Sequence, residues 1–285
     1  MHIKIIASES MGTRSMATYI ETKDAKIFID PGVNLAEKRF GLPPHPIEIE
    51  QKERDWNEIV RFIEKSEIVI ITHYHYDHFN PSSDPEIFRD KFLLIKHPTE
   101  NINESQKKRA EEFLRKIKRV PTEIIFADGK ELFAGETRIL FSKPVFHGKD
   151  PTLGYVLEVL IDDGNDRFLF TSDVQGPVRE DQVEFILENR PRIIFLDGPG
   201  TYLMNQRVSK EDIERAFNNI TSILQQDYIE LVVIDHHFLR DANWKRLLTT
   251  YVPSSLSTKI KTAAEYVGKP LRLLEANRRK LWKEY

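Results

Sequence analysis

The chain contains no cysteine among its 285 residues. Disulfide bonds, thiolate zinc sites, iron–sulfur clusters and a cysteine nucleophile are therefore excluded, and a metal ion would have to be bound by histidine, aspartate or glutamate. Apolar runs of about 18 residues are also missing, and the N-terminal segment MHIKIIASES turns polar too early for a signal peptide. We therefore expect a cytoplasmic protein without a membrane partner.

A strong excess of one charge is absent too, because 42 basic residues face 45 acidic ones and the net charge is −3. Dedicated nucleic-acid binders usually carry a basic excess, so we favour a small-molecule substrate over nucleic acid. The oligomeric state is left open by this composition. The charged fraction of 31%, rich in lysine and glutamate, resembles that of heat-adapted proteins.

The pattern of apolar residues predicts one domain over residues 1–285, since no linker or low-complexity tract divides the chain. A meander of short strands begins the chain, and a helix is predicted from about 52 to 65. Short β segments fill the middle of the chain. The last third alternates strands with helices, which are predicted over 180–188 and 209–225.

Two segments of the chain resemble each other. EIVIITH (67–73) and ELVVIDH (230–236) each contain an acidic residue, four β-forming residues, a small polar residue and a histidine. Each is predicted to be a strand that follows a helix. The match indicates two similarly built halves, roughly 1–135 and 136–285.

The cluster HYHYDH is the strongest chemical signal in the sequence. It follows the apolar run Ile68–Ile71, which is typical of a strand buried on both faces. His73 and His75 project to the same side of an extended segment, and Asp77 and His78 come from the turn that follows. Ligands usually bind at this end of strands in α/β proteins, and clustered histidines without a metal are rare. The cluster therefore predicts a metal site.

An HxHxDH motif after an apolar strand resembles the signature of the metallo-β-lactamase superfamily. The resemblance extends over nearly the whole chain and implies an α/β (α+β) fold, a four-layer αββα sandwich of two mixed sheets flanked by helices. It also implies further metal-binding residues downstream in a fixed order. The sequence contains these in order as His147 in PVFHG, Asp173 in FTSDVQG and a histidine in VVIDHHF.

The resemblance assigns these residues to two divalent ions. His73, His75 and His147 would hold the first ion, Asp77, His78 and His236 the second, and Asp173 would bridge both. Zn²⁺ is the expected metal, although Mn or Fe also suits these ligand types. We favour His236 over His237 as the last ligand because the internal match places His236 opposite His73. His237 would then support the site or face the substrate, and Asp30 in FIDPG would orient a ligand imidazole.

Four other residues have weaker signals. Asp197 in DGPGTY could line the pocket, although a tight turn that needs glycine explains the segment equally well. Arg14 in SMGTRSM could meet a substrate anion, but a solvated turn is the commoner explanation. His45 in GLPPHP is expected to be exposed, and Arg240 after the two histidines is expected to have a structural role.

The resemblance implies a metal-dependent hydrolase in which two ions share a bridging hydroxide that attacks an ester, lactone, thioester or phosphodiester. Asp77, His237 or water could protonate the leaving group. Within the superfamily the chain looks most like a mainly archaeal group of predicted metal-dependent hydrolases, which implies no particular substrate. Two alternatives stay open: an RNA- or DNA-processing nuclease that uses the basic helix 104–119, and a non-catalytic metal-stabilised binding protein.

Overall fold

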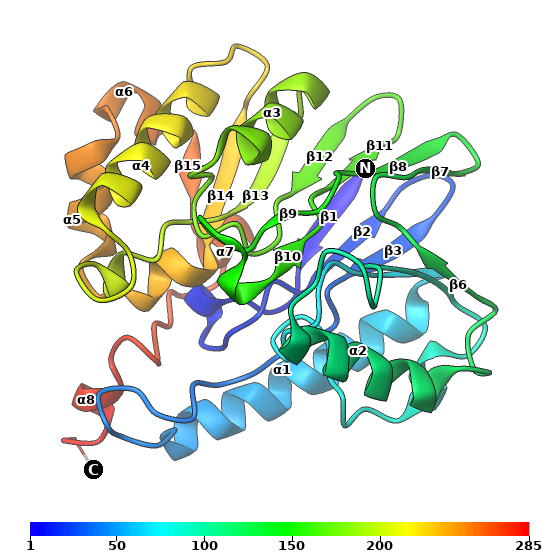
Figure 1. Ribbon diagram of the computed structural model, residues 1–285. Helices are drawn as coiled ribbons and strands as arrows, with labels where there is room; N and C mark the ends of the chain where they lie inside the picture. The colour runs from blue at the N-terminus through cyan, green and yellow to red at the C-terminus, as the bar shows by residue number, and fades with distance from the viewer. Residues whose placement is uncertain (285) are drawn as a thin grey trace.

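The computed structural model describes residues 1–284, in which two large mixed β-sheets lie between layers of helices (Figure 1). The first sheet has the order β1 (His2–Ile5), β2 (Thr18–Glu21), β3 (Lys26–Ile29), β4 (Ile68–Ile71), β5 (Phe92–Ile95) and β6 (Glu123–Phe126). Strands β1 to β3 pair antiparallel, and β3 to β6 pair parallel.

The second sheet repeats this mixture of a parallel and an antiparallel part. Its order is β15 (Ile260–Lys261), β14 (Leu231–Asp235), β13 (Ile193–Asp197), β12 (Arg167–Phe170), β11 (Val159–Asp162), β8 (Thr137–Phe141) and β7 (Glu131–Ala134). Pairing is parallel from β15 to β12 and antiparallel from β12 to β7. A separate ribbon consists of β9 (Val145–Phe146) and β10 (Tyr155–Val156).

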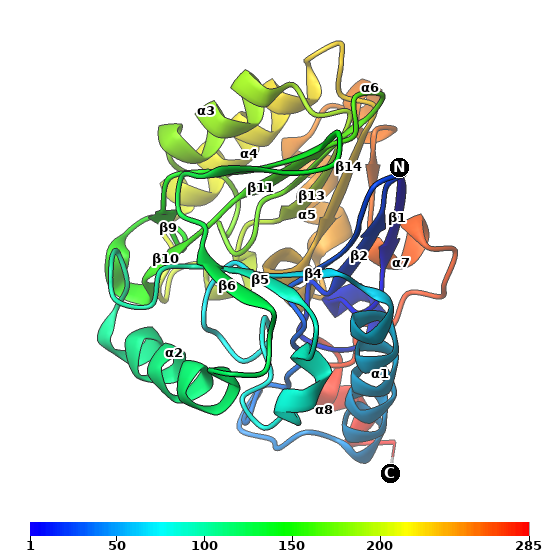
Figure 2. The same cartoon turned by 90° about the vertical axis from the view of Figure 1, so that its right-hand side faces the viewer.

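The helices cover the outer faces of the two sheets. The first sheet carries α1 (Pro46–Lys65) and α2 (Glu104–Ile117), and the second carries α3 (Glu180–Asn189), α4 (Lys210–Leu224) and α5 (Trp244–Tyr251). Figure 2 shows the two groups of helices on opposite sides of the sheets. Shorter helices are α6 (Ser254–Ser257), α7 (Ala263–Tyr266) and α8 (Arg278–Leu281). The four-layer αββα prediction is confirmed.

Three apolar clusters hold these layers together, one between the sheets and one under each set of helices. Strand β4 contributes to two of them. Ile68 and Ile70 face the core between the sheets, whereas Val69 and Ile71 face α1 and α2. Because alternate side chains of a strand point to opposite faces and both faces are covered, the strand is a continuous apolar run.

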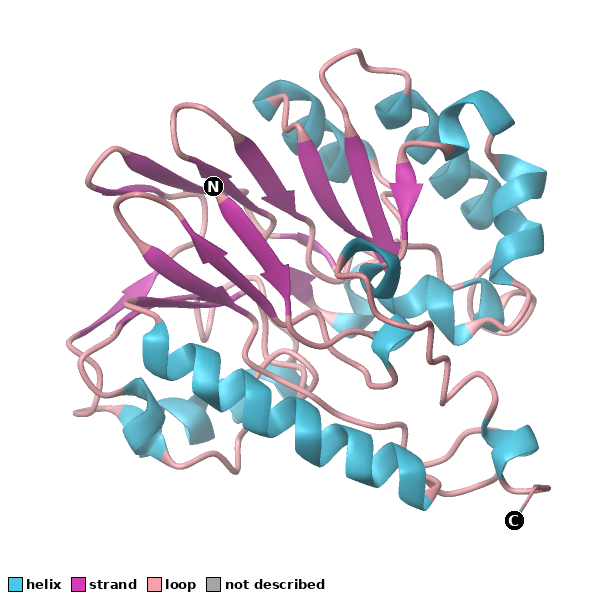
Figure 3. Cartoon of the chain, turned by 180° about the vertical axis from the view of Figure 1, so that it is seen from behind, coloured by secondary structure: helices cyan, strands magenta, loops and turns pink. Residues whose placement is uncertain are grey.

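Helix α1 begins earlier than the sequence predicted, and His45 is buried rather than exposed. Its imidazole accepts a hydrogen bond from the Ile47 amide, and the Glu48 carboxylate accepts one from the His45 amide. The C-terminal segment runs beside the start of this helix (Figure 3). There Arg278 pairs with Glu48, and the indole of Trp282 contacts His45. Residues more than 230 positions away in sequence therefore decide the burial of His45.

The other predicted helices agree with the structure to within two residues: α2 ends at Ile117, α3 spans Glu180–Asn189, and Ser209 caps α4. Within residues 1–284, no helix combines the length and the apolar character that crossing a bilayer requires.

Candidate metal centre

The candidate site lies where strands of both sheets end. Asp30 follows β3, His73 follows β4 after one residue, and His236 follows β14 directly. Asp173 comes three residues after β12. Because parallel strands end at the same edge of a sheet, these segments converge on one region between the sheets.

Four overlapping groups of candidate ligands meet there, two of which are Asp30, His73 and His78, and Asp173, Asp197 and His237. The other two groups share only Asp173. The first group is His73, His75, His147 and Asp173; the second is Asp77, His78, Asp173 and His236. Within each group the candidate ligand atoms lie within 4.8 Å of one another. The structure thus brings together all the side chains that the resemblance assigned to metal ions, in the same two sets.

Asp173 connects the groups through its two oxygens. Oδ2 lies 3.1 Å from His147 Nε2 and 3.7 Å from His73 Nε2, on the side of the first group. Oδ1 lies 2.9 Å from His78 Nε2 and 3.3 Å from His236 Nε2, on the side of the second. Asp77 Oδ2 completes the second group at 3.6 Å from His236 Nε2. One carboxylate can therefore serve two adjacent ions.

The polar atoms of this centre fit a metal ion better than they fit one another. His78 Nε2 and Asp173 Oδ1 are fully buried, and neither has a hydrogen-bond partner although they lie 2.9 Å apart. A buried polar atom without a partner costs about 1–3 kcal/mol, so each such atom requires an explanation. Two lone pairs aimed at a common point are satisfied by a divalent cation placed between them.

The charge state of the centre suits the same interpretation. Burial lowers the pKa of His73 well below its ordinary value, that of His75 to about 3, and that of His236 as well. These imidazoles are therefore neutral. His73 Nε2 lies 3.1 Å from His75 Nδ1, and His236 Nε2 lies 2.9 Å from Arg240 Nη2. Burial alone would raise the pKa of Asp173, but His78 and His236 outweigh it and hold that pKa well below its usual range. Neutral imidazoles with an ionised carboxylate are a suitable donor set for Zn²⁺.

Asp30 orients His78, as the sequence led us to expect of a supporting residue. Asp30 Oδ2 lies 2.7 Å from His78 Nδ1, while Oδ1 accepts a hydrogen bond from the Thr72 amide at 2.8 Å. With Nδ1 held in this way, Nε2 of His78 points to Asp173. Such contacts select the tautomer of a ligand histidine and fix its ring.

Strained backbone surrounds the centre. Left-handed φ angles occur at these non-glycine residues: Asp30 (51°), Ser172 (55°), Gln175 (54°) and His236 (57°). Each costs free energy that the surroundings must offset. At His236 the preceding residue does so, because the buried carboxylate of Asp235 accepts hydrogen bonds from Ser8 Oγ at 2.6 Å and from the amides of Ser10 and Ala263.

The two adjacent histidines point in different directions. His236 Nε2 faces Asp173 and Asp77, whereas His237 Nδ1 lies 3.0 Å from both oxygens of Asp197. His237 Nε2 lies 3.3 Å from the side-chain amide of Gln175, which lines the adjoining cavity. The second group therefore contains His236, and Asp197 supports His237 rather than lining the cavity itself.

Arg240 is a site residue that the sequence analysis missed. Its guanidinium is buried, with Nη2 2.9 Å from His236 Nε2 and 3.5 Å from Asp77 Oδ2. Nε donates to Glu9 Oε2 at 3.1 Å. Glu9 is 231 positions away, so no local pattern around Arg240 could have revealed this contact.

Arg14 does not have the position that the sequence analysis considered. Its guanidinium makes two hydrogen bonds to the Glu275 carboxylate, at 2.6 and 2.7 Å. It is neither solvated in a free turn nor part of the cavity wall. Arg14 therefore attaches the C-terminal segment to the N-terminal loop, which differs both from the solvated turn that the sequence favoured and from the alternative of a substrate contact.

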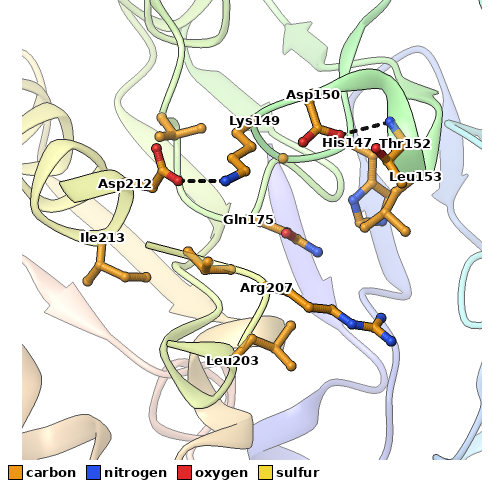
Figure 4. A pocket seen from close by; sticks show the side chains of 13 residues that line it. His147, Lys149, Asp150, Thr152, Leu153, Gln175, Leu203, Arg207, Asp212 and Ile213 are labelled. Carbon is orange, nitrogen blue, oxygen red and sulfur yellow. Dashed lines mark hydrogen bonds and ion pairs between the residues drawn. The ribbon is translucent and has the colours of Figure 1, made fainter. Parts of the chain in front are cut away.

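A cavity of about 530 Å³ adjoins the first group of metal-site residues at His147 (Figure 4). Its wall comes from the segments 147–153, 175–178 and 203–213. A volume of this size is typical of small-molecule sites. The cavity therefore offers space for a ligand beside the candidate metal centre.

Comparisons with known proteins agree with this fold. Residues 12–217 match the model of the family described as "Metallo-beta-lactamase superfamily". A UPF0282 protein of the archaeon Korarchaeum cryptofilum is 48% identical over 100% of this chain and 95% of its own length. Among solved structures, the metallo-beta-lactamase fold protein YhfI of Bacillus subtilis has a TM-score of 0.56 at 15% identity, over 91% of this chain and 94% of that one. An isothiocyanate hydrolase from Delia radicum gut bacteria has a TM-score of 0.56 at 13% identity, covering 92% and 96% of the two chains.

Proposed function

Because the chain belongs to the metallo-beta-lactamase superfamily, we propose that it is a hydrolase whose centre holds two divalent ions, with Zn²⁺ as the first metal to test. The observation that carries the proposal is the position of Asp173, whose two oxygens face two different groups of histidine side chains. A protein of the same fold that is named isothiocyanate hydrolase supports hydrolysis as the reaction class.

Divalent ions, when bound, lower the pKa of a water molecule and polarise the bond under attack. The residues of the chain would hold and orient these groups. Asp173 sets the spacing of the two positions, and Asp30 keeps His78 directed at the second. The cavity beside His147 would admit the substrate.

The proton for the leaving group would come from water. Burial acts to raise the pKa of Asp77, but His78 and His236 outweigh it and hold that pKa below its usual range. Asp77 is therefore ionised and suits a ligand role better than that of a general acid. Burial also lowers the pKa of His237 well below its ordinary value, so a neutral His237 carries no acidic proton to donate at neutral pH.

The cavity favours an ester, lactone, thioester or small phosphodiester over a polymer. Its volume suits a small molecule, and among the described residues the basic helix α2 contributes none to its wall. Arg109 of that helix instead donates to the Tyr74 carbonyl and lies over the Tyr76 ring. The nuclease alternative therefore has less support than the small-molecule hydrolase.

Metal stoichiometry tests the centre. After dialysis against Zn²⁺, the protein should retain two ions per chain by elemental analysis. His147→Ala removes a residue of the first group only and should retain one ion, whereas Asp173→Asn should lose both. His2→Ala changes an exposed histidine outside both groups and serves as the matched control.

Activity tests the reaction. The Zn²⁺- or Mn²⁺-loaded protein should hydrolyse at least one of a generic ester, lactone, thioester and phosphodiester, and Asp173→Asn should abolish this turnover. Two bound ions without turnover of any substrate class would reject the hydrolase proposal and leave the non-catalytic alternative. One ion retained by Asp173→Asn would reject the shared carboxylate.

A further inference from the structure

The cavity beside the candidate metal centre has an apolar wall. Its apolar side chains come from three segments that are distant in sequence: Leu153, Val178, Leu203, Val208 and Ile213. Ile213 and Val178 are almost fully buried, so they form a fixed floor rather than a mobile rim. Such a wall favours a ligand with an apolar body over a sugar or a free nucleotide.

Most charges on the cavity wall are already paired. Lys149 Nζ lies 2.9 Å from Asp212 Oδ2, which is the ion pair drawn in Figure 4. Asp150 accepts a hydrogen bond from the Thr152 amide at 2.9 Å and thereby caps the short helix Pro151–Leu153. The ammonium group of Lys149 and the carboxylate of Asp150 therefore each already have one partner within the chain.

Arg207 differs from these residues. Within residues 1–284 the guanidinium of Arg207 has no ion pair and no hydrogen bond; the residue is exposed and lies at the solvent side of the cavity wall. Figure 4 shows that Arg207 and Gln175 both extend toward the side of the cavity on which His147 lies. An unpaired guanidinium presents a planar set of donors that matches a carboxylate.

We infer that the substrate is an amphipathic monocarboxylate. The scissile bond of this substrate would lie near His147. Its apolar body would pack on the wall formed by Val178 and Ile213, and its carboxylate would pair with Arg207. The inference rests on the proposed hydrolase function and adds the substrate class to it. Arg207 is a specificity residue here, because it contacts a part of the substrate that does not react.

The kinetic test uses pairs of esters that differ only in the terminal charge. Mono-p-nitrophenyl esters of linear dicarboxylic acids with about four to ten carbons are compared with p-nitrophenyl esters of the corresponding monocarboxylic acids. In each hydrolysis water adds to the acyl carbon, the acyl–oxygen bond breaks, and p-nitrophenol and a carboxylic acid are released. The native protein should prefer the charged ester by about tenfold in kcat/KM at the best chain length.

The variants identify the source of that preference. Arg207→Ala should abolish it through an increase in KM for the charged ester, while kcat/KM for the neutral ester stays within about twofold. Arg246→Ala, which removes an exposed arginine of α5 outside the cavity, should retain the full preference. A preference for the neutral esters, or an equal preference in Arg207→Ala and the native protein, would overturn the inference.

A binding measurement separates this inference from the hydrolase proposal. Suberic acid monoamide and octanamide are titrated by NMR into protein stripped of metal with EDTA, so that no bound ion competes for the carboxylate. The monoamide should bind the native protein at least fivefold more tightly than octanamide does, and Arg207→Ala should bind both equally. Equal binding to the native protein would reject the inference. If the monoamide binds more tightly than octanamide but no metal-dependent turnover is found, only the hydrolase proposal is rejected.

Discussion

Gly32 lies so close to the turn of the HYHYDH segment that a single added methyl group should displace a candidate ligand. A Cβ atom at this position would lie 2.3 Å from the Phe79 amide nitrogen and 2.5 Å from the backbone nitrogen of His78. Nonbonded heavy atoms normally stay about 3.5 Å apart, so the backbone at 78–79 would have to move by about 1 Å. The Gly32 carbonyl accepts a hydrogen bond from Ser15 Oγ at 2.6 Å. This contact restrains the segment around Gly32 from moving away from residues 78–79.

The size of this displacement decides the expected effect. Zinc–ligand distances tolerate about 0.2 Å, so a shift of about 1 Å at His78 should remove it from the second group. Asp30 would lose its 2.7 Å contact with His78 at the same time. Overpacking against backbone should also lower the free energy of unfolding by about 1–3 kcal/mol. We therefore expect Gly32→Ala to retain one ion per chain instead of two.

Elemental analysis after dialysis and chemical denaturation in EDTA measure the two effects separately. Gly200→Ala is the matched control, because the nearest atom to its added Cβ is 4.0 Å away. That variant should retain both ions and lose less than about 1 kcal/mol, the usual cost at an unstrained position. If Gly32→Ala bound two ions with native affinity, the close approach of these backbones would not position the second group.

Three further outcomes follow from buried groups. Asp30→Asn should weaken metal binding about 10- to 100-fold by titration, because His78 loses its charged partner; unchanged affinity would show that Asp30 does not orient the ring. Burial raises the pKa of Asp55 to about 6 from 3.8, so the folded chain retains a proton that the unfolded chain releases. The free energy of unfolding should then fall by about 3 kcal/mol as the pH rises from about 4 to 7, and denaturation of Asp55→Asn should lack this loss. Arg278→Ala leaves the buried Glu48 carboxylate without its charged partner and should cost about 3–5 kcal/mol in a denaturant titration. A loss below about 1 kcal/mol would contradict that account.

Much of the candidate site could be predicted from the sequence because its residues follow strands directly. A strand such as Ile68–Ile71 is recognisable from its apolar run, and the residues after it in HYHYDH must lie at its end. The same reasoning applies to His236 after Leu231–Asp235. Local order along the chain was therefore enough to place HYHYDH and His236 at strand ends, whereas the fold and the assignment of ligands to two ions followed from the resemblance to the superfamily. The substrate class left no such pattern.

Residues whose partners are distant in sequence could not be predicted in this way. His45 has the sequence surroundings of an exposed loop residue, yet Trp282 contacts its ring and buries it. Arg14 has the appearance of a solvated arginine in a turn, yet it pairs with Glu275. The start of α1 was predicted too late for a related reason, because a histidine cap preceding a proline is a weak signal without the contacts that cover it.

By itself, the sequence predicted a metal site at HYHYDH from residue types that follow a buried strand, and the fold class and the remaining candidate ligands through its resemblance to a known superfamily. Only the tertiary structure decided which way each of His236 and His237 points, that Arg240 reaches Asp77, and that Arg207 stands unpaired in a cavity beside His147. The physical reason is that the direction, the burial and the partners of a side chain depend on residues brought together by the packing of two sheets. Residues that are distant in sequence produce no periodic pattern from which such contacts could be predicted.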